Sequence, residues 1–109
     1  MGKTINSRRK GKAGELELAH YLTERGYDAR RGQQYSAANG DPDVIGLSGV
    51  HIECKRVERL DLDAALDQSV RDARAGEVPV VIHRKNRQKW RVTMLLDDFL
   101  DMYGGNHEG

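Results

Sequence analysis

The chain has little cysteine and no long apolar run. Its single cysteine, Cys54, excludes an intramolecular disulfide, and its four histidines have no partner pair of cysteines with zinc-finger spacing. No stretch reaches about 18 apolar residues, and none follows Met1, which argues against a membrane span and a secretory signal. We therefore expect a soluble, cytoplasmic protein. With sulfur ligands scarce, any bound metal should be held by oxygen, which favours Mg²⁺ or Mn²⁺.

Charge is distributed unevenly along the chain, although the net charge is only +1. Two runs carry basic residues and no acidic ones: Lys3, Arg8, Arg9, Lys10 and Lys12, and then Arg84, Lys85, Arg87, Lys89 and Arg91. Each run could contact the phosphates of a polyanion, or could be an ordinary solvated loop or tail. The segment between the runs and the segment near the C-terminus are acidic, so their faces should avoid a polyanion.

The length of 109 residues allows one hydrophobic core and is too short for two. Residues 1–10 are polar, basic and aperiodic, which predicts a flexible basic arm. We expect residues 11–103 to form the single domain and residues 104–109 to form a disordered tail.

Three segments have the periodicity of amphipathic helices. In residues 11–25 the apolar stripe contains Leu18 and Leu22 and also Glu15, which places a carboxylate on the core-facing side. A second stripe runs from about 62 to 75 and stops before Gly76. The third segment, 95–103, spaces four large residues for burial: Leu96, Phe99, Leu100 and Tyr103.

Five short segments have the character of strands: 27–31, 44–47, 50–54, 80–82 and 89–94. Ser48-Gly49 separates the second from the third, which predicts a hairpin. The run Val80-Val81-Ile82 is continuous and apolar, as in a strand buried on both sides. The element order αβββαββα predicts an α/β fold with a mixed sheet flanked by helices.

The predicted hairpin brings acidic and basic groups together. Asp43 follows Pro42 at the start of its first strand, and Pro42 favours a rigid, extended entry because it fixes φ and lacks an N–H. In the second strand, the period of two points Glu53 and Lys55 to one side, toward Asp43, with His51 on the same side. Two carboxylates and an amine so placed could hydrolyse a phosphodiester with a divalent metal.

The motifs Arg9-Lys10-Gly11, Glu15, Pro42-Asp43-Val44 and Ile52-Glu53-Cys54-Lys55 resemble those of a known superfamily. They are similar to the PD-(D/E)xK nucleases, which have the restriction-endonuclease-like fold, and within them to archaeal-type and phage Holliday junction resolvases. The resemblance extends from about residue 8 to residue 94. The acidic string alone is weak, but the Glu on the first helix and the matching element order make the combination specific.

The resemblance implies a role for each residue of this set. Asp43 and Glu53 would be the principal ligands of Mg²⁺, or of Mn²⁺, with the backbone carbonyl of Cys54 as a further ligand and Glu15 binding directly or through water. Lys55 would orient the attacking water or help to deprotonate it. The two basic runs, rather than the resemblance, supply the expected DNA-binding residues: Arg8, Arg9, Lys10, Lys12, Arg84, Lys85 and Arg87. The host would be a bacterium, an archaeon or a phage-infected cell.

Each candidate also has a simpler interpretation. Asp43 could be a turn carboxylate, and Glu53 with Lys55 a solvent-facing pair. Glu15 could be an acidic residue that the helix macrodipole stabilises. The other candidates are weaker: Asp41 favours a turn, His51 a structural or substrate-side role, Gln68 a solvent-facing position and Trp90 the core, and Ser36 cannot be aligned with the serine of the resolvases.

Three functions fit these observations. The first is a Mg²⁺-dependent endonuclease that cleaves branched DNA as a homodimer, because two symmetric strands require two active sites and one such domain supplies one. The second is a nuclease of the same fold that acts on duplex, nicked or flap DNA, in repair or restriction. The third is a non-catalytic nucleic-acid-binding module, against which the complete set of acids and lysine argues.

Overall fold

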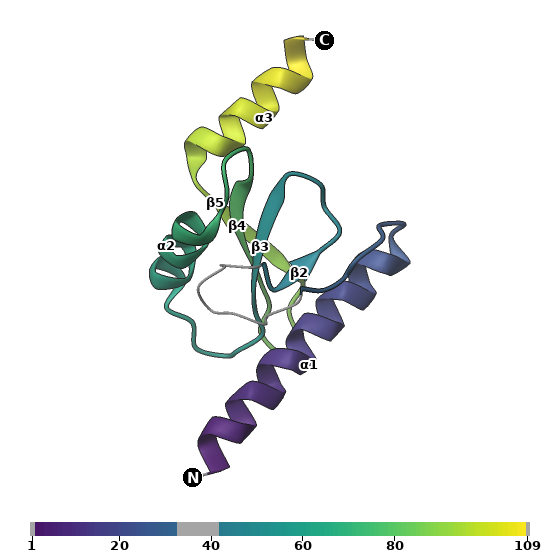
Figure 1. Cartoon of the computed structure of the whole chain (residues 1–109), viewed down its shortest axis with the longest axis vertical. Helices are drawn as coiled ribbons and strands as arrows, with labels where there is room; N and C mark the ends of the chain where they lie inside the picture. The colour runs from purple at the N-terminus through teal and green to yellow at the C-terminus, as the bar shows by residue number, and fades with distance from the viewer. Residues whose placement is uncertain (1, 33–41, 109) are drawn as a thin grey trace.

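The computed structural model describes residues 2–32 and 42–108. Its elements follow one another as predicted, in the order αβββαββα (Figure 1). They are α1 (Gly2–Glu24), β1 (Arg30–Arg31), β2 (Val44–Ile45), β3 (Val50–Lys55), α2 (Leu62–Asp72), β4 (Val78–His83), β5 (Arg91–Met94) and α3 (Leu96–Glu108). The predicted α/β class is therefore confirmed, while β1 is shorter than the segment expected at 27–31.

The five strands form one mixed sheet in the order β1-β2-β3-β4-β5. β3 and β4 are parallel, with Glu53 opposite Val81, and the other neighbouring strands are antiparallel. A parallel pair needs a crossover, which α2 provides. The C-terminal ends of β3 and β4 consequently lie at the same edge of the sheet.

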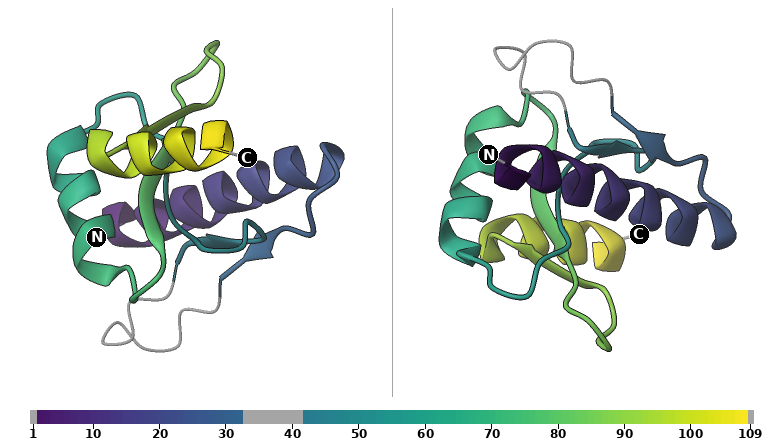
Figure 2. Two further views of the ribbon diagram at one scale, coloured as in Figure 1. Left: turned by 90° about the horizontal axis from the view of Figure 1, so that it is seen from above. Right: turned by 90° about the horizontal axis from the view of Figure 1, so that it is seen from below.

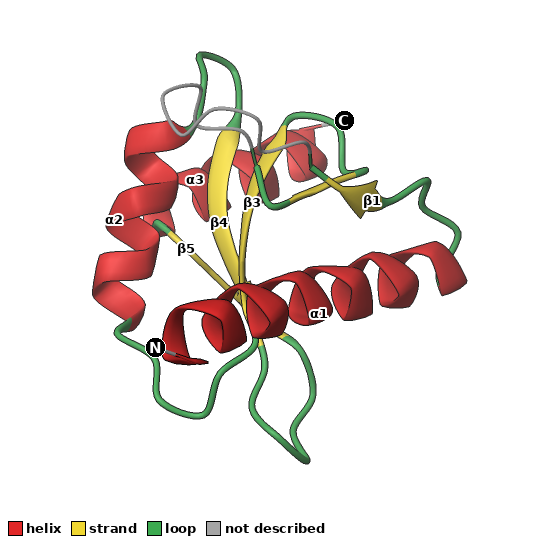
Figure 3. Ribbon diagram, turned by 60° about the horizontal axis from the view of Figure 1, so that its bottom comes forward, coloured by secondary structure: helices red, strands yellow, loops and turns green. Residues whose placement is uncertain are grey.

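Both faces of the central strands are covered, as Figures 2 and 3 show for α1 and α2. Leu18, Ala19 and Leu22 of α1 pack against Ile52, Cys54, Val80 and Ile82 and against Val44. On the opposite face, the buried Ser69 of α2 donates its hydroxyl to the backbone oxygens of His51 and Val80, at 3.3 and 3.0 Å. Since residues of a strand alternate between faces, His51 and Glu53 point toward the α2 side.

The two chain ends differ from the sequence prediction. Residues 2–10, expected as an arm without regular structure, continue α1, and residues 104–108, expected as a tail, continue α3. Adding residues to an existing helix costs far less than nucleating one, and Lys and Arg are good helix formers. The division of the chain into an arm, one domain and a tail stays a prediction. Among the residues described, no helix is long and apolar enough to span a membrane.

The predicted burial of the α3 stripe is wrong. Leu96, Phe99, Leu100 and Tyr103 are 67%, 48%, 49% and 54% exposed. In Figure 1 the helix extends beyond the end of the sheet instead of lying on it. Helical spacing identifies an apolar face but does not specify which surface covers it, and no other part of residues 2–32 and 42–108 covers this one.

Candidate metal centre

A cavity of about 460 Å³ lies at the C-terminal end of β3. It brings together α1, the residue before β2, β3 with the segment after it, and α2. All four predicted catalytic residues line this cavity, which is bounded by Gly11, Glu15, Asp43, Glu53, Cys54, Lys55, Arg56, Val57 and Gln68. Gln68, expected to face solvent, is exposed and also borders the cavity. Ser36 and Asp41 lie outside the described residues.

Asp43 is fixed through its backbone and its side chain. Its N–H donates to the Ile52 oxygen at 2.9 Å, and its carbonyl accepts from the Gly32 N–H at 2.8 Å. A Cβ on Gly32 would lie 1.9 Å from the Pro42 oxygen, so this approach requires glycine. The carboxylate accepts the Cys54 N–H at 2.8 Å. Asp43 is therefore a carboxylate that β3 holds in one orientation. The simpler interpretation, a carboxylate that only shapes a turn, does not account for this contact with β3.

Glu15 reaches the cavity from the middle of α1, where its side chain is buried. Arg31 holds it there, with its Nε donating to Oε1 at 2.8 Å. A Cβ on the preceding Gly14 would lie 2.5 Å from the Cβ of Arg56, so glycine lets α1 approach the end of β3 closely. Because α1 begins at Gly2, Glu15 is far from the first turn, and the macrodipole interpretation is wrong.

Glu53 is buried beside His51, whose Nε2 lies 3.4 Å from Oε1 of Glu53. The imidazole is completely buried, which leaves it the structural role and excludes direct contact with a substrate. Its Nδ1 lies 3.5 Å from Oε1 of Glu77, without hydrogen-bonding geometry. Burial lowers the pKa of His51, but the hydrogen bond and charge of Glu53, with Glu77 and Asp72, raise it above its ordinary value.

Asp72 completes a second cluster that the sequence did not indicate. Potential ligand atoms of His51, Glu53 and Asp72 all lie within 4.8 Å of one another. Asp72 ends α2, far along the chain from β3, and only the α2 crossover brings it to Glu53. No local spacing motif could have revealed this neighbour.

Crowding of carboxylates dominates the electrostatics of the cavity. Burial, then the charge of Glu53 and also that of Glu15, raise the pKa of Asp43 to about 7, against the opposing effect of the Cys54 N–H. Burial also raises the pKa of the Cys54 thiol far above its ordinary value, so the sulfur stays neutral in the core. A set of oxygen donors with unfavourable mutual charge fits a hard divalent cation such as Mg²⁺.

The stability of the metal-free protein should therefore decrease as pH rises. The pKa of Asp43 is about 7 when folded and 3.8 in the unfolded reference, so the folded state binds the extra proton between these values. The contribution of Asp43 to the free energy of unfolding is intact below pH 4 and is lost as pH rises through 7. The change amounts to a few kcal/mol, at ~1.4 kcal/mol per pKa unit. Thermal unfolding at pH 5 and pH 8 measures this, and Mg²⁺ should raise the melting temperature more at pH 8. Equal pH dependence in wild type and Asp43→Asn would contradict the assignment.

The predicted DNA-binding residues occupy different environments. Lys12 is exposed on α1, and Lys85 and Arg87 are exposed in the hairpin between β4 and β5. Arg84 instead forms an ion pair with Glu17 of α1. The side chains of Arg8, Arg9 and Lys10 lie outside the described residues.

Arg56 is a basic residue that the sequence interpretation missed. It lines the cavity, and its Nε donates to Oε1 of Glu17 at 3.1 Å. It also donates to Oδ1 of Asn86 in the β4–β5 hairpin at 2.9 Å. Its position directly after the Glu53-Cys54-Lys55 motif was the available signal, since it follows the strand that carries the motif.

Comparison with known proteins agrees with this geometry. The family described as phage putative PDDEXK endonucleases matches residues 6–106. Among solved structures, the Holliday junction resolvase Hjc from the archaeal hyperthermophile Archaeoglobus fulgidus is similar, with a TM-score of 0.59 and 27% identity over 78% of this chain and 72% of that one. No curated protein matches. The likeness to Hjc confirms the expected restriction-endonuclease-like fold.

Proposed function

Because this chain belongs to the phage PDDEXK endonuclease family, we propose that it is a Mg²⁺-dependent DNA endonuclease that resolves four-way junctions. The observation that carries the proposal is the single cavity that gathers Glu15, Asp43, Glu53 and Lys55. Junctions are favoured as substrate because the similar solved structure is a Holliday junction resolvase. Two basic residues that line the cavity, Lys55 and Arg56, favour a polyanionic substrate.

Asp43 and Glu53 would hold the cation, with the Cys54 carbonyl as a further ligand and Glu15 binding directly or through water. Bound there, Mg²⁺ supplies Lewis-acid polarisation of the phosphate and acidifies water. The Cys54 N–H and Arg31 keep two of the carboxylates in place, which limits the rearrangement that binding requires. Lys55 places an ammonium at the same cavity, where it can orient the attacking water or accept its proton in the neutral form.

A substrate panel tests this proposal. Labelled four-way junction, duplex, nicked duplex and flap of matched sequence are incubated with excess enzyme and Mg²⁺, and single-turnover rates are measured. We expect the junction to be cut about tenfold faster than the others, a difference of ~1.4 kcal/mol in activation free energy. Equal rates would favour the duplex, nick or flap nuclease instead. Binding without any cleavage would favour the non-catalytic module.

The predicted basic arm should contribute to DNA binding through phosphate contacts. Replacing Arg8 and Arg9 by Gln should weaken binding and reduce the slope of log affinity against log salt by roughly 2, since each phosphate contact contributes ~0.9. Fluorescence anisotropy with labelled junction in EDTA measures the slope. The matched control replaces Arg59 and Arg71, which are exposed in the acidic part of the chain, and should leave the slope unchanged. The same slope in all three proteins would remove the arm from the interface.

The proposed enzyme acts as a homodimer, and α3 offers the surface for it. Leu96, Phe99, Leu100 and Tyr103 form an exposed apolar stripe on this helix. All four side chains are large and two are aromatic, which is the composition found at the buried centre of protein–protein interfaces. The acidic residues of α3 lie on its other side at 100° per residue, so two copies can meet through uncharged stripes.

Sedimentation velocity tests this surface without DNA. The wild type is expected to sediment as a dimer at micromolar concentrations, and Phe99→Glu as a monomer, because a buried unpaired charge is costly. Val70→Glu is the matched control, since Val70 is a similarly exposed apolar residue on α2, at 41%. A wild type that stays monomeric at micromolar concentrations, or a Phe99→Glu protein that is dimeric, would contradict the assignment.

A further inference from the structure

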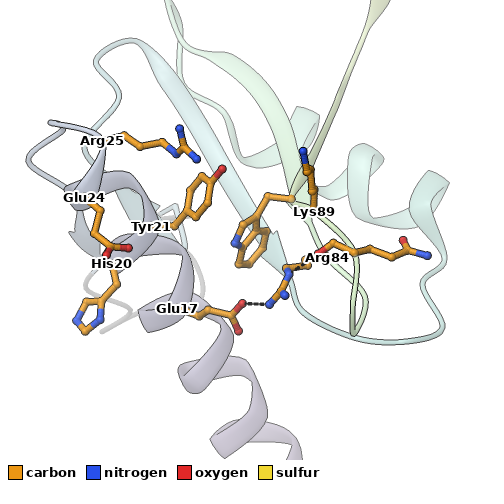
Figure 4. Close-up of a pocket in the computed structure, with 9 residues that line it drawn as sticks. Glu17, His20, Tyr21, Glu24, Arg25, Arg84 and Lys89 are labelled. Atoms are coloured by element: carbon orange, nitrogen blue, oxygen red, sulfur yellow. Dashed lines mark hydrogen bonds and ion pairs between the residues drawn. The ribbon is translucent and has the colours of Figure 1, made fainter.

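A groove of about 560 Å³ lies between α1 and the β4–β5 hairpin, outside the metal cavity (Figure 4). Its volume is within the range of ~300–1,000 Å³ typical of small-ligand sites. The α1 side is polar and aromatic, and the hairpin side is basic. The lining residues are Glu17, His20, Tyr21, Glu24, Arg25, Arg84, Gln88, Lys89 and Trp90.

The groove offers two aromatic surfaces with cations beside them. Trp90, the only tryptophan, is partly buried against the core and partly exposed to the groove. Tyr21 lines the α1 side, and the Arg25 guanidinium lies over its ring at 4.3 Å from the centroid. Figure 4 shows Lys89 on the opposite side. Aromatic faces and nearby cations are the elements with which proteins hold unpaired nucleotides, the ring stacking on the base and the cation meeting the phosphate.

Ion pairs at the bottom of this groove hold its side chains in place and connect the groove to the metal cavity. Arg84 pairs with Glu17, and its Nε donates to the Gln88 oxygen at 2.6 Å. Glu17 also accepts from Arg56, which lines the metal cavity. Two arginines thus neutralise Glu17, so its charge does not oppose a phosphate. Among the lining residues that the structure describes, Glu24 is then the one acidic residue without such neutralisation, whereas Arg25 and Lys89 both carry positive charge. The groove is therefore suited to an anion that also has an aromatic ring.

We infer that this groove binds an unpaired nucleotide of the DNA that enters the metal cavity. The base would stack at Trp90 and Tyr21, and its phosphate would meet Arg25 or Lys89. The inference rests on the proposed function, because the ligand is a part of that substrate. It adds that the enzyme engages a base that has left its pair near the cleavage point, and a pair opens more readily at a branch point, where the stack is interrupted, than within intact duplex.

The single tryptophan reports on the groove directly. Short oligothymidylate is titrated in EDTA, so that no cleavage occurs, and Trp90 fluorescence is followed. We expect saturable quenching, and affinity reduced about tenfold or more in Tyr21→Leu, because stacking on one aromatic ring commonly contributes this much. Lys89→Gln, at an exposed position, should also weaken binding. Tyr27→Leu is the matched control, since Tyr27 is 50% exposed and does not line the groove.

An abasic oligomer of equal length distinguishes base stacking from phosphate binding. The inference requires that it bind at least several-fold more weakly, and equal affinity would overturn the inference. Quenching that neither Tyr21→Leu nor Lys89→Gln weakens would overturn it as well. Junction cleavage in Mg²⁺ without any quenching would refute nucleotide binding in the groove and leave the nuclease proposal standing. The expected quenching with no cleavage of any substrate would refute the nuclease proposal and leave nucleotide binding in the groove standing.

Discussion

Asp43→Asn is expected to abolish DNA cleavage and to make the metal-free protein more stable. The substitution removes a charged ligand from the proposed metal centre, which should lower the single-turnover rate by roughly 10³-fold or more. It also removes a half-buried negative charge that is raised in energy by the charges of Glu53 and Glu15. The Asn side-chain oxygen can still accept the Cys54 N–H, so the local structure should persist.

The gain in stability follows from the raised pKa of Asp43. At pH 8 the wild-type carboxylate is ionised against a folded-state pKa of about 7, which disfavours folding. Removing this penalty should raise the free energy of unfolding by about 1–3 kcal/mol and the melting temperature by several degrees. Active sites often carry such a conflict between stability and activity.

Two measurements on one preparation test the prediction: single-turnover cleavage in Mg²⁺ and thermal unfolding in EDTA at pH 8. Asp67→Asn is the control, because Asp67 is an exposed carboxylate of α2 outside the cavity. It should cleave at the wild-type rate with unchanged stability. An Asp43→Asn protein that cleaves within about tenfold of wild type, a loss of only ~1.4 kcal/mol, would remove Asp43 from the metal centre.

Lys55→Met should reduce cleavage by about 10²–10⁴-fold, the usual contribution of a positioned acid or base, while DNA binding is largely retained. Met keeps the length and the apolar stem of lysine and removes only the amine. Lys55→Arg should not restore activity, because a guanidinium is bulkier and does not deprotonate in proteins. Lys55 is partly exposed, so neither change should affect folding strongly.

Cleavage rates and binding affinity in EDTA separate the possible roles of Lys55. A lower rate with unchanged affinity indicates a role at the attacking water. An equal loss of both would make Lys55 only a phosphate contact. Arg71→Met, which removes a cation from an exposed position of α2, is the control and should change neither quantity.

Local patterns were sufficient to predict the centre of the fold and the convergence of the candidate site. The stripe of α1 placed Glu15 beside Leu18 and Leu22, and all three are buried. The period of two in β3 placed Glu53 and Lys55 on one side, and both line the cavity with Asp43. These features depend on spacing within one element and on the hairpin between two neighbours, which sequence encodes directly.

Features that depend on distant elements were not predictable. The ion pair of Arg31 with Glu15 joins β1 to α1, and the Asp72 neighbour of Glu53 arrives through the α2 crossover. Neither has a local signal. The stripe at Leu96 and Phe99 has the pattern of a core helix, yet both residues are exposed, because the pattern does not specify which surface, if any, packs against the stripe.

The most direct test of the metal centre is the position of Mn²⁺ in a crystal of the wild-type protein, located by anomalous diffraction. The cavity is predicted to hold a peak between the carboxylates of Asp43 and Glu53, next to the Cys54 carbonyl, and the peak should be lost in Asp43→Asn. A peak found only at the His51, Glu53 and Asp72 cluster, or none near Asp43 at saturating Mn²⁺, would contradict the account.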